Sequence, residues 1–134
     1  MAAESAVQFE ALEAQAASIT DLFKQAGYEQ VAPSMLQPAS LFLDRMGESL
    51  RARTYVFTDN DGEELCLRPD LTLPVARLHL ERHPLAETEA RYCYNGPAFR
   101  YQPGGSKAAG PREFRQAGIE HIGGASTITA EAEV

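Results

Sequence analysis

Hydrophobic and polar residues alternate along this chain with two periods, one typical of helices and one typical of strands. From about Ser5 to Ala26, apolar residues recur every three or four positions, which predicts an amphipathic helix. The stripe on the apolar side of this helix consists of Leu12, Ala16, Ile19, Phe23 and Ala26. Gly27 is expected to end the helix, because glycine readily adopts the left-handed conformation found at helix C-termini.

Two later segments are also predicted to be helical. Thr72 to Arg82 has Thr72 in the capping position and Pro74 in the first turn, where a missing backbone N–H breaks no hydrogen bond. Pro38 to Met46 is a shorter helical segment with Pro38 in its first turn.

Strand-like segments lie between and after these helices. They are Glu29 to Ala32, Arg53 to Thr58, Glu63 to Leu67, Ala98 to Gln102 and Glu113 to Ile122. Pro33 ends the first, because proline cannot donate to a strand ladder. The sequence Asp-Asn-Asp-Gly at 59–62 is a hairpin-turn signal between the second and third. Helices combined with hairpin-linked strands predict an α+β fold, a mostly antiparallel sheet flanked by helices.

The extent of the chain and its charge narrow the picture. A last helix is expected to begin at Thr129, about one turn before the sequence stops, so residues 1–134 are expected to be the N-terminal part of a single larger domain. The net charge of −7 argues against a nucleic-acid partner. No apolar run approaches the roughly 18 residues of a membrane span, and the N-terminus lacks the basic region of a signal peptide.

Two cysteines, Cys66 and Cys93, lie in apolar, strand-like runs. This placement favours reduced, buried thiols in a cytoplasmic protein, although a disulfide between them stays open from the sequence alone.

Candidate chemistry concentrates near the last two strands. Gln116 and Glu120 share a parity, so in a regular strand their side chains point to the same face. Arg100 lies on the preceding strand. A guanidinium opposite an amide and a carboxylate can bind both ends of a zwitterion, because it takes a carboxylate while the acid takes an ammonium. The pattern predicts a free amino acid as the ligand.

The segment 67–72, Leu-Arg-Pro-Asp-Leu-Thr, adds two candidates where a strand meets a helix. Asp70 and Thr72 are common helix-capping residues. The alternative interpretation is that Asp70 accepts an ammonium group and that Thr72 forms a hydrogen bond beside it. For Arg100, an exposed position and a buried one paired with Glu120 or a ligand carboxylate both stay open.

Other polar groups carry less information. His79, Glu81 and His83 could form a metal pair on one helix face, but no third ligand has suitable spacing, so solvated helix residues are the preferred interpretation and no metal is expected. We assign no role to His121. The glycine-rich loop at 103–111, with Ser106 and Lys107, is either a simple connection or a loop that closes over a ligand. No catalytic nucleophile or phosphate-binding loop is evident.

Taken together, four segments resemble the core of the class II aminoacyl-tRNA synthetases, in particular the histidyl branch. The residues from Gly27 to Pro33 resemble the first class II motif, a helix and strand that form a dimer interface in that family. The resemblance continues over RTYVFTDNDGEELCLRPDLT at 53–72, like the hairpin and RPEGT segment, over the second motif from Phe99, and over FRQAGIE at 114–120, like the histidine-contacting strand. It covers roughly residues 10 to 134.

The chain departs from the synthetases at specific positions. The second motif usually reads Phe-Arg-x-Glu, and Gln102 stands where that glutamate helps to position ATP. In the RPEGT segment, Asp70 and Leu71 replace the glutamate and the glycine. The positions similar to histidine contacts all remain: Asp70, Thr72, Arg100, Gln116 and Glu120. The resemblance thus implies a retained amino-acid pocket without the activation chemistry.

That combination is most similar to the family of regulatory subunits of ATP phosphoribosyltransferase. The resemblance implies a noncatalytic protein of histidine biosynthesis that needs no cofactor, assembles with a short-form catalytic subunit, self-associates through the first-motif region and binds L-histidine for feedback. The alternatives are a fragment of a divergent histidyl-tRNA synthetase and an isolated amino-acid-binding module.

Overall fold

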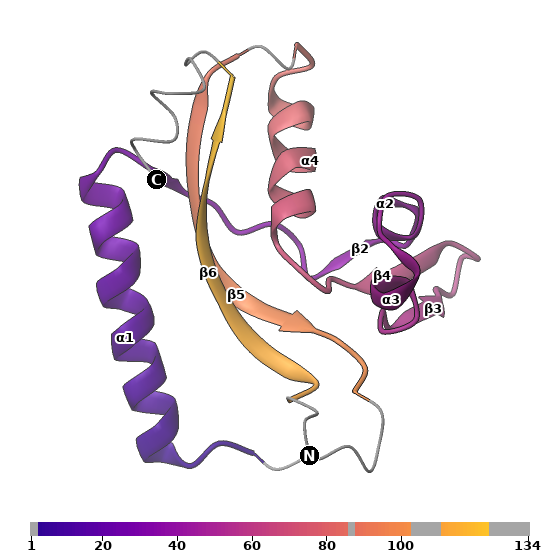
Figure 1. Cartoon of the computed structure of the whole chain (residues 1–134), viewed down its shortest axis with the longest axis horizontal. Helices are drawn as coiled ribbons and strands as arrows, with labels where there is room; N and C mark the ends of the chain where they lie inside the picture. Colours follow the sequence, from indigo (N-terminus) through magenta and orange to yellow (C-terminus); the bar gives the residue numbers. More distant parts are fainter. Residues whose placement is uncertain (1–2, 86–87, 103–110, 124–134) are drawn as a thin grey trace.

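The computed structural model describes residues 3–85, 88–102 and 111–123 (Figure 1). The helices are α1 (Ala6–Gln25), α2 (Ser40–Leu43), α3 (Glu48–Arg51) and α4 (Thr72–Arg82). The strands are β1 (Glu29–Gln30), β2 (Leu36–Pro38), β3 (Val56–Thr58), β4 (Glu64–Leu67), β5 (Ala90–Phe99) and β6 (Glu113–Ile122). Within the described part of the chain, no helix is long and apolar enough to cross a membrane.

The strands form two small sheets, one with the order β1-β5-β6 and one with the order β2-β4-β3. All strand pairs are antiparallel except β1 with β5, so the predicted α+β fold with a mostly antiparallel sheet is confirmed. The long β5–β6 hairpin runs through the middle of the molecule, with α1 on one side and α4 on the other (Figure 1). Its register pairs Ala90 with Ile122 and Phe99 with Glu113.

The first helix follows its predicted boundaries closely. Ser5 caps it, because the N–H of Gln8 donates to the Ser5 hydroxyl and the N–H of Ser5 donates to the Gln8 side chain. At the other end, Gly27 has a φ of +95°, the left-handed conformation expected of the stop. Four of the five predicted stripe residues are half-buried, and the last, Ala26, is exposed.

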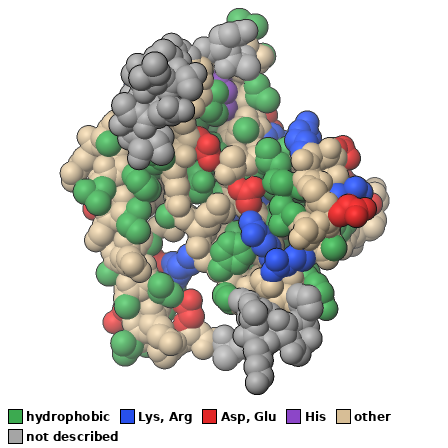
Figure 2. Space-filling model, in the orientation of Figure 1, with side chains coloured by type: hydrophobic (Ala, Val, Ile, Leu, Met, Phe, Trp, Pro, Cys, Tyr) green, Lys and Arg blue, Asp and Glu red, His purple; other side chains and the backbone are tan. Residues whose placement is uncertain are grey.

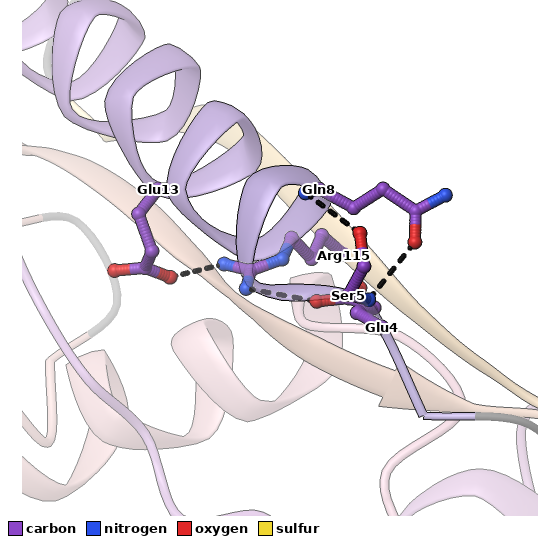
Figure 3. Close-up of polar contacts among 5 residues, drawn as sticks. All are labelled: Glu4, Ser5, Gln8, Glu13 and Arg115. Carbon is purple, nitrogen blue, oxygen red and sulfur yellow. Dashed lines mark hydrogen bonds and ion pairs between the residues drawn. The ribbon is translucent and has the colours of Figure 1, made fainter.

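Arg115 of β6 links α1 to the sheet through ion pairs. Arg115 leaves β6 on the face opposite Gln116 and forms ion pairs with Glu13 and, at 3.9 Å, with Glu4 (Figure 3). Its guanidinium also lies 5.6 Å from the ring of Phe9. The space between α1 and β5 is a cleft of about 430 Å³, visible as a hollow in Figure 2.

The main core lies between α4 and the inner face of the long hairpin. Tyr92, Tyr94 and Ala98 of β5 pack there against residues of α4 and of the segment before it. The other buried members are Val31, Leu71 and Val75. A smaller core beneath α2 contains Ala39, Phe42 and Cys66. As predicted, both cysteines are buried, and they are free thiols in different sheets; burial raises the pKa of Cys66 to about 11.

Several predicted boundaries were wrong. The helix predicted from Pro38 is limited to α2, because Pro38 belongs to β2, and α3 was not predicted. The strands predicted at Glu29 and Arg53 are shorter than expected. The strand predicted at Ala98–Gln102 in fact begins at Ala90 and ends at Phe99.

Proline explains the error in β5. Pro97 directly precedes the predicted start of the strand, yet it lies within β5. Past Cys93, β6 is the only described strand that pairs with β5. The N–H that Pro97 lacks would point away from β6, so no hydrogen bond between strands is lost. That side is occupied instead by Arg68, whose Nε donates to the Pro97 carbonyl.

Arg68 joins three parts of the fold. Its side chain is 4% exposed, with Nε 2.8 Å from the Pro97 carbonyl oxygen and Nη1 2.7 Å from the Pro33 carbonyl oxygen. The pKa of Arg68 is lowered by burial. Gly96 makes room for it, since a Cβ there would lie 2.6 Å from Nη2. Carbonyl acceptors therefore satisfy this buried guanidinium in place of a carboxylate.

We predict that Arg68→Met destabilises the full-length protein by about 3 kcal/mol, because two buried carbonyls lose a charged donor. The exposed Arg45→Met provides a matched control, and its effect is expected to stay within about 0.5 kcal/mol. Urea unfolding followed by circular dichroism measures both. Equal stabilities for the two variants would contradict the role assigned to Arg68.

Candidate functional site

The five predicted site residues gather around one short segment, Pro69 to Thr72, which links β4 to α4. Arg100 donates from Nε to the Pro69 carbonyl oxygen at 2.9 Å. Gln116 accepts the Leu71 N–H at 3.1 Å. Contacts of Asp70 and Thr72 complete the cluster, which thus draws on α4, β6 and the residue after β5.

Asp70 organises the start of α4. Its side chain is 8% exposed, and Oδ1 accepts the N–H of Thr72 at 2.6 Å. The predicted cap at Thr72 was wrong, because Thr72 is the first helical residue and the capping position belongs to Leu71, which has no side-chain bond. Asp70 is not the capping residue either, but from one residue before that position it bonds to the first helical N–H. Its Oδ2 has no hydrogen-bond donor among the described residues, so Asp70 keeps an acceptor for other groups.

Glu120 lies within the same cluster but has different partners from those expected. The Tyr94 hydroxyl donates to its Oε1 at 3.3 Å, and the side chain of Thr72 lies near it. Burial raises the pKa of Glu120, as does the nearby charge of Asp70, while the hydroxyls of Thr72 and Tyr94 oppose the rise. Two carboxylates thus lie close together with neutral donors as their neighbours.

Arg100 lies one residue beyond the end of β5, which corrects its predicted position within a strand. Its guanidinium carbon is 5.3 Å from the centre of the Phe114 ring. Apart from the bond to Pro69, its side chain has no hydrogen-bond or ion-pair partner among the described residues, so the alternative in which it pairs with Glu120 is not realised. Arg100 is half-buried and retains donors for an anion.

The cluster contains side chains of both charges. Asp70 and Glu120 provide negative charge, while Arg100, which bonds to the Pro69 carbonyl, provides positive charge. Such a site suits a molecule that carries both an anionic and a cationic group.

Two residues of this cluster were missed in the sequence. Tyr94 is buried and bonds to Glu120, while Gly118 lies directly opposite it in the register. A glycine in the middle of an otherwise regular strand often marks a close approach by another group, and that signal could have pointed to the pair.

Two of the three departures from the synthetase pattern, Gln102 and Leu71, have structural explanations. Gln102 accepts a hydrogen bond from Arg53 Nη2 through its side-chain oxygen, and its backbone carbonyl accepts one from Arg112 at 3.4 Å. Leu71 is 1% exposed and belongs to the main core. Both side chains therefore make contacts within the chain: Gln102 forms hydrogen bonds, and Leu71 packs in the core.

The histidines lie outside the cluster. His79 was expected to be solvated, but it is 1% exposed, because α4 packs on β5 and Nδ1 lies 2.7 Å from the Tyr92 hydroxyl. His121 Nε2 lies 3.1 Å from Glu89 Oε1. No group of three or more metal-ligating side chains occurs among the residues that the structure describes. The predictions for Ser106 and Lys107, and for a helix at Thr129, lie outside the described residues.

Comparison with known proteins gives one consistent family. The sequence profile described as "Histidyl-tRNA synthetase" matches residues 5–134. An ATP phosphoribosyltransferase regulatory subunit from Mesorhizobium japonicum is 42% identical over 117 residues, which is 87% of this chain and 30% of that protein. One of the same name from Allorhizobium ampelinum is 40% identical with the same coverage. The chain thus spans about 30% of the length of these curated relatives.

Solved structures agree in fold. An ATP phosphoribosyltransferase regulatory subunit/histidyl-tRNA synthetase from Bacillus halodurans superposes with a TM-score of 0.83 at 25% identity, over all of this chain and 33% of that one. An apo histidyl-tRNA synthetase from S. aureus superposes with a TM-score of 0.77 at 23% identity, over 99% of this chain and 30% of that one. The predicted class II synthetase-like core is therefore confirmed.

The raised pKa of Glu120 leads to a prediction for stability. The folded state favours the protonated form of Glu120. Protonated Glu120 therefore stabilises the fold at acid pH, and this stabilisation is lost as the pH rises through the pKa of Glu120 in the folded state. We expect Glu120→Gln to melt at a higher temperature than wild type at pH 7, and this advantage to shrink as the pH falls through the raised pKa of Glu120. Thermal melts of the ligand-free, full-length protein test this.

The control for this prediction is Glu113→Gln, which changes an exposed carboxylate on the same strand. Its melting temperature should follow that of wild type across the pH series. A lower melting temperature for Glu120→Gln at pH 7 would indicate that the Glu120 charge stabilises the fold, contrary to the prediction.

Proposed function

Because the chain belongs to the histidyl-tRNA synthetase family, we propose that it is part of a noncatalytic regulatory subunit of ATP phosphoribosyltransferase, in the first step of histidine biosynthesis. The whole protein assembles in the cytoplasm with the catalytic subunit, which carries out the transfer reaction. The observation that carries this proposal is the polar cluster around Pro69–Thr72, together with Gln102, whose amide oxygen is occupied by Arg53.

The ligand of this cluster is free L-histidine, bound through Asp70, Thr72, Arg100, Gln116 and Glu120. Support comes from the paired carboxylates, which suit a cationic group, and from the donors that Arg100 retains for a carboxylate. Binding of histidine here provides the feedback signal for the assembled enzyme.

A role in histidine activation is the second candidate, because the fold is shared with histidyl-tRNA synthetases. Gln102 argues against it, since its side-chain oxygen is held by Arg53 and it lacks the charge of a glutamate. Histidine-dependent pyrophosphate exchange by the full-length protein alone would establish the synthetase activity and overturn the regulatory assignment.

Reconstitution tests the regulatory function directly. We expect the full-length protein to raise the transferase activity of a short-form catalytic subunit and to make that activity sensitive to histidine. Unchanged transferase activity, together with no complex by analytical ultracentrifugation, would contradict the proposal.

We predict that Glu120→Gln weakens histidine binding roughly 10- to 100-fold, because a charge-assisted hydrogen bond is worth about 1.5–3 kcal/mol. Isothermal titration calorimetry of the full-length protein, alone and with its catalytic partner, measures the change. Glu113→Gln is the matched control and should bind like wild type. Tight ATP binding with no response to histidine in either setting would exclude the proposed ligand.

The complete protein also self-associates through α1 and the residues from Gly27 to Pro33. Among the described strands, β1 lies at the edge of its sheet, and α1 exposes hydrophobic side chains along its outer side, including Val7 and Leu22 at 77% and 65% (Figure 2). Val31 is buried in the chain's own core, so a charge there would test folding and not association.

We therefore predict that Leu22→Asp shifts the full-length protein from dimer to monomer without lowering its helical content. Gln25→Asp places the same charge on an exposed position one turn later and serves as the control. Light scattering over micromolar concentrations measures the association, and circular dichroism reports the fold. A wild-type monomer over this range would show that the surface does not associate.

A further inference from the structure

The ring of Tyr94 occupies the space that a side chain at position 118 would fill. A Cβ built on Gly118 would lie 2.5 Å from the Tyr94 hydroxyl oxygen and 2.8 Å from Cζ. Gly118 does not have a positive φ, so its backbone conformation places no demand for glycine. The absence of a side chain here therefore serves the tyrosine on the neighbouring strand.

The hydroxyl of Tyr94 reaches the polar cluster because of this close approach. It lies 3.3 Å from Glu120 Oε1 and near the side chain of Thr72. A buried tyrosine hydroxyl requires partners, and these two come from β6 and α4. The contact thus fixes the Glu120 carboxylate from the side of β5.

A second tyrosine on the same strand gives an internal comparison. Tyr92 precedes Tyr94 by two residues, points to the same face and is equally buried, but its hydroxyl lies 2.7 Å from His79 Nδ1. Tyr92 is therefore matched to Tyr94 in its strand, face and chemistry. It differs in the partner of its hydroxyl and in its cross-strand neighbour, which is Glu120.

We propose that Tyr94 is a positioning residue for ligand binding, which holds the Glu120 carboxylate in place through its hydroxyl and depends on Gly118 for the space to do so. The inference rests on the proposed histidine-binding function of the cluster. It adds two residues to the proposed histidine-binding cluster: Tyr94, which acts through Glu120, and Gly118, which acts through Tyr94.

The electrostatics of the cluster make this contact consequential. Among the described residues, the ionisable groups acting on Glu120 are Asp70 at the start of α4 and Tyr94 on β5. Burial and the Asp70 charge favour the protonated carboxyl, whereas the hydroxyls of Thr72 and Tyr94 favour the ionised form. Removing the phenol hydroxyl should therefore extend protonation to higher pH, where a neutral carboxyl attracts a cationic ligand less strongly.

The test uses Tyr94→Phe in the full-length protein, with Tyr92→Phe as the control. The Glu120 carboxyl is titrated by NMR in ¹³C-glutamate-labelled, ligand-free protein and assigned with Glu120→Gln. In Tyr94→Phe the titration midpoint should move to higher pH, and in Tyr92→Phe it should not move. Calorimetry with L-histidine should show roughly tenfold weaker binding for Tyr94→Phe near neutral pH and an acid limb displaced to higher pH.

Gly118→Ala provides a second, independent variant. It should displace the Tyr94 ring and shift the Glu120 titration in the same direction as Tyr94→Phe. In the double variant, the alanine should add little to the loss of histidine affinity, because the hydroxyl bond is already absent.

The outcomes distinguish the positioning role of Tyr94 from the identity of the ligand. A Glu120 titration that moves in Tyr94→Phe while wild type binds no histidine would support the positioning contact and overturn the ligand. A titration and a histidine pH profile that are both unchanged in Tyr94→Phe would overturn the role of Tyr94, whatever the wild-type affinity.

Discussion

The structure depends on a buried arginine that is satisfied by backbone. Arg68 bonds to the carbonyl of Pro33, which follows β1, and to that of Pro97 in β5. Because these bonds fix the end of β4 against the long hairpin, the next four residues lie beside β6. The interaction that joins the two sheets thus also positions the site. The hydrogen bonds of Arg68 hold the site residues in a fixed geometry.

The cluster around Pro69–Thr72 combines stabilising and destabilising features. Asp70 satisfies an N–H at the start of α4, so its charge supports the fold. Glu120 is partly desolvated and close to Asp70, so its charge opposes the fold while making the cluster attractive to a cation. This division between neighbouring carboxylates is typical of sites in which binding, not stability, selects the residues.

The sequence predicted those features that depend on local pattern. The period of α1, the glycine at its end and the parity of Gln116 and Glu120 follow from near neighbours along the chain, and each is confirmed. The early course of β5 was missed because the tolerance of Pro97 depends on which strand lies alongside it. The partners of Glu120 and Arg100 were missed for a similar reason, since they are set by contacts across 26 and 31 positions in the sequence.

Leu71 restricts which residues its position can accept. Its N–H is bonded to Gln116, and its side chain fills the main core, at the position where the synthetase pattern has glycine. Replacing it with glycine would open a cavity whose cost, by analogy with other leucine truncations, is about 2–5 kcal/mol. Glycine can therefore occupy this position without loss of stability only if neighbouring side chains refill the space.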